Sequence, residues 1–264
     1  MYFVKTKREK NSVCNLCRRV ADLTWDHVPP KGGIDLSTVK MQSILHLMTS
    51  DQKNQKLRES QNGLKFRTLC GDCNSFLGSE YDQEVNRFSK GLATIFESEI
   101  ELPSKVNFKL NIQRLLKGMI GHLVAAKISE ETTVFDEEVR EYVLDREALL
   151  PENVHIFYWV YPYKCTVIMR DFLMFTPRGT FRDPAVFQML KYYPVAFLVC
   201  NRPDYANLDC LSKYGRVEID QEITLNINTA PRGGAYWPEA PSDKENNVLV
   251  VGEDGANSVH AMAK

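Results

Sequence analysis

The segment LCGDCNSFLG, residues 69–78, decides how the first part of this chain folds. Cys70 and Cys73 are separated by two residues, a spacing that lets a tight turn present both thiolates to one metal ion. A second pair with the same spacing, Cys14 and Cys17, lies in CNLC near the start of the chain. Two such pairs complete a tetrahedral site of four cysteines, which is typical of structural zinc. We therefore predict an N-terminal domain whose fold is held by zinc and in which this ion takes no part in chemistry.

The composition indicates an ordinary globular chain. Of its 264 residues, 44% are hydrophobic and 25% are charged, and the net charge of −1 requires any polyanionic partner to bind at a local positive patch. No apolar run has the length of a signal peptide or of a membrane span, so we expect a cytoplasmic protein with no membrane partner. The reducing cytoplasm favours metal binding over disulfides for the paired cysteines. We expect Cys165, Cys200 and Cys210 to be small buried hydrophobes.

The insertion between the two cysteine pairs begins with TWDHVPPKGG, residues 24–33. On a strand, adjacent side chains point to opposite faces, so Asp26 and His27 cannot jointly bind one ion there. We expect a division of roles, in which Asp26 binds an ion and His27 acts on a group beside it. Asn74 directly follows the last cysteine of the pairs, and a helix over 74–78 directs its amide oxygen toward the strand of Asp26. Two hard oxygen ligands and open water positions suit Mg²⁺ or a similar divalent ion.

The motifs CNLC, TWDHVPP and LCGDCNSFLG, in this order, resemble an HNH (ββα-metal) endonuclease of the zinc-binding type, similar to the endonuclease VII branch. The resemblance covers about residues 10–80, less than a third of the chain. It implies that DNA is the expected substrate and that His27 is the general base. It implies that Asp26 and Asn74 bind a catalytic Mg²⁺ or Mn²⁺, and that structural Zn²⁺ is held by Cys14, Cys17, Cys70 and Cys73.

One position departs from this family pattern. Many members carry an asparagine five residues before the third cysteine, where it braces the loop that bears the histidine, and this chain has Lys65 there. We expect Asn62 or another part of the loop to replace it. Lys31 and Arg67 are candidates for nucleic-acid binding through backbone phosphates, which makes binding fall with salt. The remaining histidines lack a partner at ligand spacing and are expected to be structural or on the surface: His46, His122, His155 and His260.

The whole chain predicts an α+β fold in three parts. Residues 1–80 form the HNH/ββα-metal nuclease domain, in which the polar segment 32–64 is a long loop with one short helix. Residues 81–130 form a helical connector, because apolar side chains at helical spacing predict two linking helices, over 79–96 and 111–128. Residues 131–264 form a mixed α/β accessory domain rich in antiparallel strands. The predicted strands are rich in β-branched and aromatic residues or alternate in polarity, and lie in 155–163, 165–175, 194–201, 217–227 and 248–251.

These patterns predict a metal-dependent endonuclease that hydrolyses phosphodiester bonds in nucleic acid, with DNA favoured over RNA. Restriction or phage (antiviral) defence is the expected role, by analogy with the family alone. One alternative is a zinc-containing module that binds nucleic acid or protein without catalysis. Another is a nuclease activated by a ligand of residues 100–264. No motif decides the role of that region, and its patterns are compatible with recognition of a nucleic-acid structure, with a homodimer or with a partner protein bound through the C-terminal domain.

Overall fold

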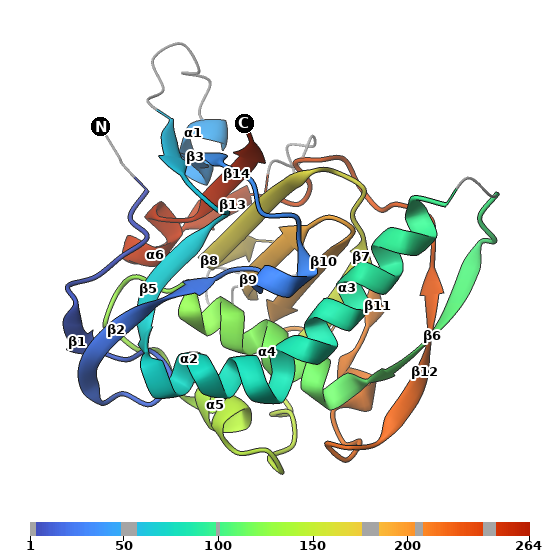
Figure 1. Cartoon of the computed structure of the whole chain (residues 1–264), viewed down its shortest axis with the longest axis horizontal. Helices are drawn as coiled ribbons and strands as arrows, with labels where there is room; N and C mark the ends of the chain where they lie inside the picture. The colour runs from blue at the N-terminus through green and yellow to red at the C-terminus, as the bar shows by residue number, and fades with distance from the viewer. Residues whose placement is uncertain (1–3, 49–56, 99–100, 176–184, 204–207, 240–246) are drawn as a thin grey trace.

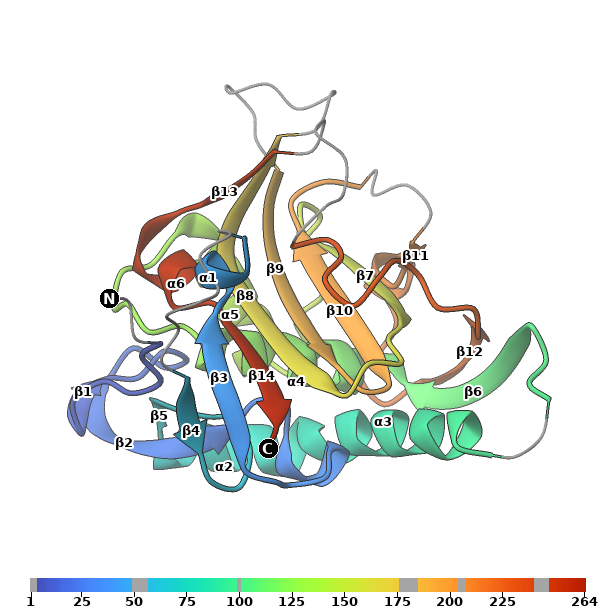
Figure 2. The ribbon, with the colours of Figure 1, turned by 90° about the horizontal axis from the view of Figure 1, so that it is seen from above.

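The computed structural model describes residues 4–48, 57–98, 101–175, 185–203, 208–239 and 247–264. Within these ranges the chain is a mixed α/β protein, as expected, with antiparallel sheets and helices that cover one face of the largest sheet (Figures 1 and 2). None of the helices in these ranges is long and apolar enough to cross a membrane.

The N-terminal part contains a small antiparallel sheet followed by a helix. Its three strands are ordered β1 (Asn11–Val13), β2 (Val20–His27) and β5 (Lys65–Cys70). Helix α2 (Gly71–Leu77) begins directly after β5 and contacts β2. The polypeptide therefore passes from the end of β5 into α2 within the second cysteine pair.

A nearly continuous helical segment follows. Helix α2 leads through the π-helical turn η3 (Gly78–Asp82) into α3 (Gln83–Phe96), which confirms the predicted helix in this region. The second predicted helix is confirmed as α4 (Ile112–Ala125), where the side chain of Asn111 caps the first turn. Between α3 and α4 lies a strand, β6 (Lys105–Asn111), which was not predicted.

Helix α4 is the central helix of the molecule. All of its residues except Arg114 are buried, since it lies against α3, α5 (Val134–Leu144) and strands of the large sheet (Figure 2). Its glycines permit this close approach. A Cβ atom at Gly121 would lie 2.7 Å from the Leu77 side chain, and one at Gly118 would lie 2.6 Å from Val85. The side chains of α4 therefore reach the helical segment that follows the cysteine site.

The largest sheet contains the strands that the sequence predicted over 155–163, 165–175, 194–201 and 248–251. Every pair in it is antiparallel. Along its main path the order is β11 (Asp209–Cys210), β7 (His155–Val160), β10 (Val195–Cys200), β9 (Ala185–Tyr192), β8 (Cys165–Phe175), β14 (Val259–Ala263), β3 (Val39–Ser43) and β4 (Arg58–Ser60), and β13 (Asn247–Val250) pairs with β8.

The structure corrects the prediction of a long loop over 32–64. Two strands from this segment, β3 and β4, belong to the large sheet, and the expected short helix is α1 (Ile44–Met48). Strand β3 pairs with β14 near the end of the chain, with Ser43 opposite Val259. Strand β4 lies at the edge of the sheet, and β3 lies next to it, paired with both β14 and β4. The insertion between the cysteine pairs thus joins the N-terminal site to the C-terminal sheet.

Alternate residues of β7 pack on opposite faces of the sheet. Tyr158 faces the helices, whereas Phe157, Trp159 and Tyr161 belong to a second apolar cluster on the other face. The prediction that these aromatic side chains form a sheet core is confirmed. The other elements include α6 (Gly252–Ala256), the 3₁₀ turn η4 (Ser212–Tyr214) and β12 (Glu222–Asn228). Strand β12 pairs with β6, where 217–227 was predicted to form a strand.

Candidate functional site

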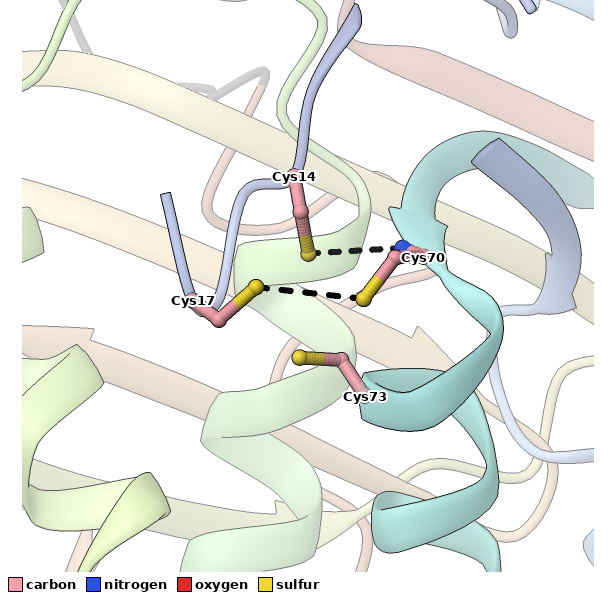
Figure 3. Close-up of side chains that lie close together, drawn as sticks. All are labelled: Cys14, Cys17, Cys70 and Cys73. Carbon is pink, nitrogen blue, oxygen red and sulfur yellow. Dashed lines mark hydrogen bonds between the residues drawn. The ribbon is translucent and has the colours of Figure 1, made fainter. Parts of the chain in front are cut away.

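Four cysteines converge where β1, β2, β5 and α2 meet. Cys14 and Cys17 lie in the turn between β1 and β2, Cys70 ends β5, and Cys73 lies in the first turn of α2 (Figure 3). All four sulfur atoms lie within 4.8 Å of one another, and none forms a disulfide. The Cys17 and Cys70 sulfurs are 3.8 Å apart, and the Cys70 amide donates to the Cys14 sulfur at 3.3 Å. The predicted site of four cysteines is therefore confirmed as a cluster that can hold a metal ion.

The electrostatics of this cluster also fit a cation. A hydrogen bond from the Cys73 thiol lowers the pKa of Cys14 to about 4. Contact with Cys14, together with burial, raises the pKa of Cys73, and burial raises that of Cys70. Four thiolates in so small a volume repel each other, so a bound cation is needed for all of them to ionise. A tetrahedron with bonds of about 2.3 Å places sulfurs about 3.8 Å apart, which matches the Cys17–Cys70 separation.

Asn74 in α2 turns its side chain toward β2, but its amide nitrogen faces this strand, where the sequence predicted the amide oxygen. Its Nδ2 donates to the Trp25 carbonyl at 3.0 Å and to the Thr24 hydroxyl at 3.1 Å. Because a backbone carbonyl only accepts, these contacts fix the orientation of the amide and leave Oδ1 as a free acceptor. The nitrogen of this amide is thereby held against the backbone that leads into Asp26, and Oδ1 lies on the other side of the amide group.

Asp26 lies on the buried face of β2, opposite Phe66 in the strand pairing. Its Oδ2 lies 3.1 Å from Nδ1 of His122, a residue of α4 that is fully buried. The other ring nitrogen of His122 lies 2.8 Å from Oδ1 of Asp82. Burial by itself would lower the pKa of His122, but the carboxylates of Asp82 and Asp26 raise it to about 10. A charged imidazolium therefore bridges the two carboxylates.

His27 lies next to Asp26 on the opposite face of β2, and its ring is braced by the backbone. Its Nε2 lies 3.0 Å from the carbonyl oxygen of Asn62. Since the carbonyl only accepts, Nε2 carries the proton and Nδ1 is the basic nitrogen of the neutral ring. Burial lowers the pKa of His27, and the charges of Lys65 and Lys31 lower it further. Asn62 thus braces His27 as the sequence suggested, but through its main chain.

The two predicted phosphate-binding residues differ in their surroundings. Lys31 is exposed in the short 3₁₀ turn η1 (Lys31–Gly33), close enough to His27 to influence its pKa. Arg67 on β5 donates from Nε and Nη2 to the carbonyl of Arg8, at 3.2 and 2.7 Å. The guanidinium of Arg67 therefore helps to attach the N-terminal segment to β5. Of the two candidates, Lys31 is the one whose side chain makes no such hydrogen bond to another described residue.

Sequence reasoning missed the connection between Asp26, His122 and Asp82. His122 was expected to be structural or on the surface, and it is buried against the proposed metal ligand. No sequence signal links it to Asp26, because the two residues are 96 positions apart and lie on different elements. Asp82 likewise stands in no motif of the sequence.

The chain was compared with known protein families, with curated proteins and with solved structures. No family model matches it, and no match was found among the curated proteins or among the solved structures. The resemblance to HNH endonucleases therefore rests on the sequence motifs, of which the structure bears out the four-cysteine cluster.

Proposed function

We propose that this protein is a metal-dependent HNH endonuclease that hydrolyses phosphodiester bonds in nucleic acid, with DNA as the expected substrate. The observation that supports it best is the set of contacts around the end of β2. Asn74 is bound to the backbone immediately before Asp26, and His27 is held with its basic Nδ1 free. A carboxylate, an amide oxygen and an oriented imidazole are the groups that such a hydrolase needs.

In this proposal the four cysteines hold structural zinc. Their site is closed by protein ligands, so it has no position for a substrate or a reactive water. Its task is to join the turn after β1 to the start of α2. This joint fixes α2 against β2 and thereby fixes Asn74 relative to Asp26 and His27.

The residues that would hold the catalytic ion are Asp26 and Asn74, through oxygens that suit Mg²⁺ or Mn²⁺. When bound, such an ion polarises the phosphate and stabilises negative charge on the leaving oxygen. His27 acts as the general base, because its lowered pKa leaves Nδ1 unprotonated at neutral pH, ready to accept a proton from the attacking water. Lys31 offers a positive charge for the phosphate backbone near this base.

Restriction or defence against phage is the biological role that the family resemblance favours, and it is proposed by analogy. Each chain has one proposed catalytic site, and this is compatible with a homodimer or with a partner protein bound through the C-terminal sheet. With one base and one ion site, each chain cuts one strand at a time.

A nicking assay tests the proposal. Supercoiled plasmid and, in parallel, single-stranded circular DNA are incubated with the full-length chain, purified without chelators, with and without added Mg²⁺ or Mn²⁺. We expect nicking that depends on the added ion and falls by a factor of about 100 or more in His27→Ala. His155→Ala on β7, outside the site, is the matched control and should retain activity. Zinc content should be the same in all three proteins.

Two results would contradict the nuclease. Wild-type protein with its zinc that cleaves neither the plasmid nor the single-stranded DNA under either ion favours the binding module without catalysis. Equal nicking by wild type and His27→Ala removes His27 as the base and points to a contaminating enzyme.

A further inference from the structure

We propose that Trp25 is a stacking platform for an unpaired nucleobase, and that the substrate class of the site is single-stranded nucleic acid. This inference rests on the proposed nuclease function and specifies its substrate. Trp25 directly precedes Asp26 on β2, and 44% of its surface is exposed. Trp159, by contrast, is buried in the core of the sheet. An aromatic ring exposed beside the proposed site offers a face on which a nucleobase can stack.

The strand pairing places Trp25 on the same face as the proposed base. Side chains two residues apart on a strand share one face and lie about 6.8 Å apart, so Trp25 and His27 project together while Asp26 points inward. On the neighbouring strand, Arg67 stands opposite Trp25, and Lys65 stands opposite His27. These four side chains form one block on the outer face of the β2–β5 pair.

The two cations of this block have different tasks. The guanidinium of Arg67 lies 5.5 Å from the centre of the Trp25 ring and is anchored to the carbonyl of Arg8, so it supports the ring in place. The amine of Lys65 lies 6.0 Å from the ring centre, and it forms no ion pair with a carboxylate in the described part of the chain. Lys65 is therefore available to a phosphate next to the stacked base.

The exposed ring favours a single strand over a duplex. In a continuous duplex both faces of each base are covered by the neighbouring bases, so a tryptophan reaches a base only where the base is unpaired and unstacked. A surface that recognises duplex backbone needs only cations. The Trp25 ring, next to Arg67 and Lys65 and near the proposed general base His27, instead fits a single nucleotide. Its nucleobase would stack on Trp25, and its phosphate would lie at Lys65 and His27.

Binding measurements without turnover test this assignment. Fluorescence anisotropy with a labelled oligothymidylate and with a duplex of equal length compares affinities for the full-length chain, without added Mg²⁺ or Mn²⁺. We expect Trp25→Ala to weaken single-strand binding by about 5- to 150-fold and to leave duplex binding unchanged. Trp25→Phe should retain most of the affinity, because phenylalanine also stacks. Val20→Ala is the matched control, since Val20 lies on the same strand and is 67% exposed.

Lys65→Ala separates stacking from charge. It should weaken single-strand and duplex binding alike and reduce the dependence of log affinity on log salt by about one. The stacking site is overturned if Trp25→Ala, shown to be folded by its thermal melting, binds the single strand as wild type does. It is also overturned if Trp25→Ala weakens binding of the single strand and of the duplex by the same factor, or if the wild-type protein does not bind the single strand.

The failure of this inference is distinguishable from that of the nuclease. Single-strand binding that depends on Trp25, without cleavage under Mg²⁺ or Mn²⁺, supports the stacking site and contradicts the enzyme. Ion-dependent cleavage of single strands that Trp25→Ala leaves unchanged contradicts the stacking site and retains the enzyme.

Discussion

Nδ1 of His122 lies 3.1 Å from Oδ2 of Asp26, and both side chains are buried. Asp82, on the other side of the imidazole, keeps His122 charged. One oxygen of Asp26 is therefore occupied by a hydrogen bond from a cation, while Oδ1 makes no hydrogen bond to another described residue. Ligating carboxylates are commonly held by such outer hydrogen bonds, which fix the direction of the remaining oxygen. His122 is thus a positioning residue for the proposed ligand Asp26.

His122→Ala should destabilise the protein by about 3–5 kcal/mol, because it leaves two carboxylates without their shared counter-ion, one of them deeply buried. Urea unfolding followed by circular dichroism measures this change. His155→Ala, on a half-buried surface position of β7, is the control and should cost about 1 kcal/mol or less. Equal effects of the two substitutions would show that the His122 bridge contributes little.

The stability of the protein should also depend on pH in the alkaline range. The pKa of His122 is raised in the folded state from 6.5 to about 10, so folding is favoured by its proton. This contribution is fully present below pH 6.5 and is lost as the pH rises toward 10, with a slope of at most about 1.4 kcal/mol per pH unit. Urea unfolding at several pH values measures the slope. In Asp82→Asn the loss should be complete at a lower pH, and an identical profile would contradict the bridge.

The pH profile of cleavage should follow His27. The base acts in its neutral form, so activity rises with pH through the pKa of His27, which burial and Lys65 hold below the usual 6.5. Single-turnover cleavage rates measured across the acid range should therefore reach their plateau at a lower pH than an unperturbed histidine would give. Lys65→Ala removes a charge that lowers this pKa, so the midpoint should move to higher pH. Lys105→Ala, exposed on β6, which pairs with β12 and not with β2, should leave the midpoint unmoved. An unchanged Lys65→Ala profile would count against His27 as the titrating base.

Cys70→Ser should abolish zinc binding and unfold the N-terminal sheet, because a four-cysteine site contributes folding free energy through its ion. Metal analysis should find about one zinc per chain in wild type and much less in the variant. Cys210→Ser lies outside the cluster and should keep both zinc and fold. A stable, fully active Cys70→Ser protein would refute structural zinc.

Gly121→Ala should disturb the site from a distance. The added Cβ would lie 2.7 Å from Cδ2 of Leu77, so the Leu77 side chain, or α4 with the adjacent His122, must shift. We expect a loss of about 1–3 kcal/mol in stability, as for an overpacked core, together with weaker ion-dependent cleavage. Gly234→Ala, whose Cβ would meet no atom within 4 Å, is the matched control. Thermal melting and the nicking assay measure both effects.

Local patterns predicted those elements whose signal lies in a short run of residues. Helix α4 follows from its apolar spacing, and strands β7, β8 and β10 follow from their dense β-branched and aromatic side chains. Strands β3 and β4 were missed, because they have only five and three residues and depend on backbone pairing with distant or neighbouring strands. The partner of β3, β14, stands more than two hundred residues away.

The sequence by itself determined the four-cysteine cluster and the choice of Asp26, His27 and Asn74 as candidates, because ligand chemistry requires particular side chains at particular spacings. Only the tertiary structure decided what surrounds them. His27 is braced by the carbonyl of Asn62, and a carbonyl is the same in every residue, so the side chains do not encode this contact. Asp26 finds His122 because two glycines let α4 approach the helices after the cysteine site, and that proximity exists only once the chain is folded.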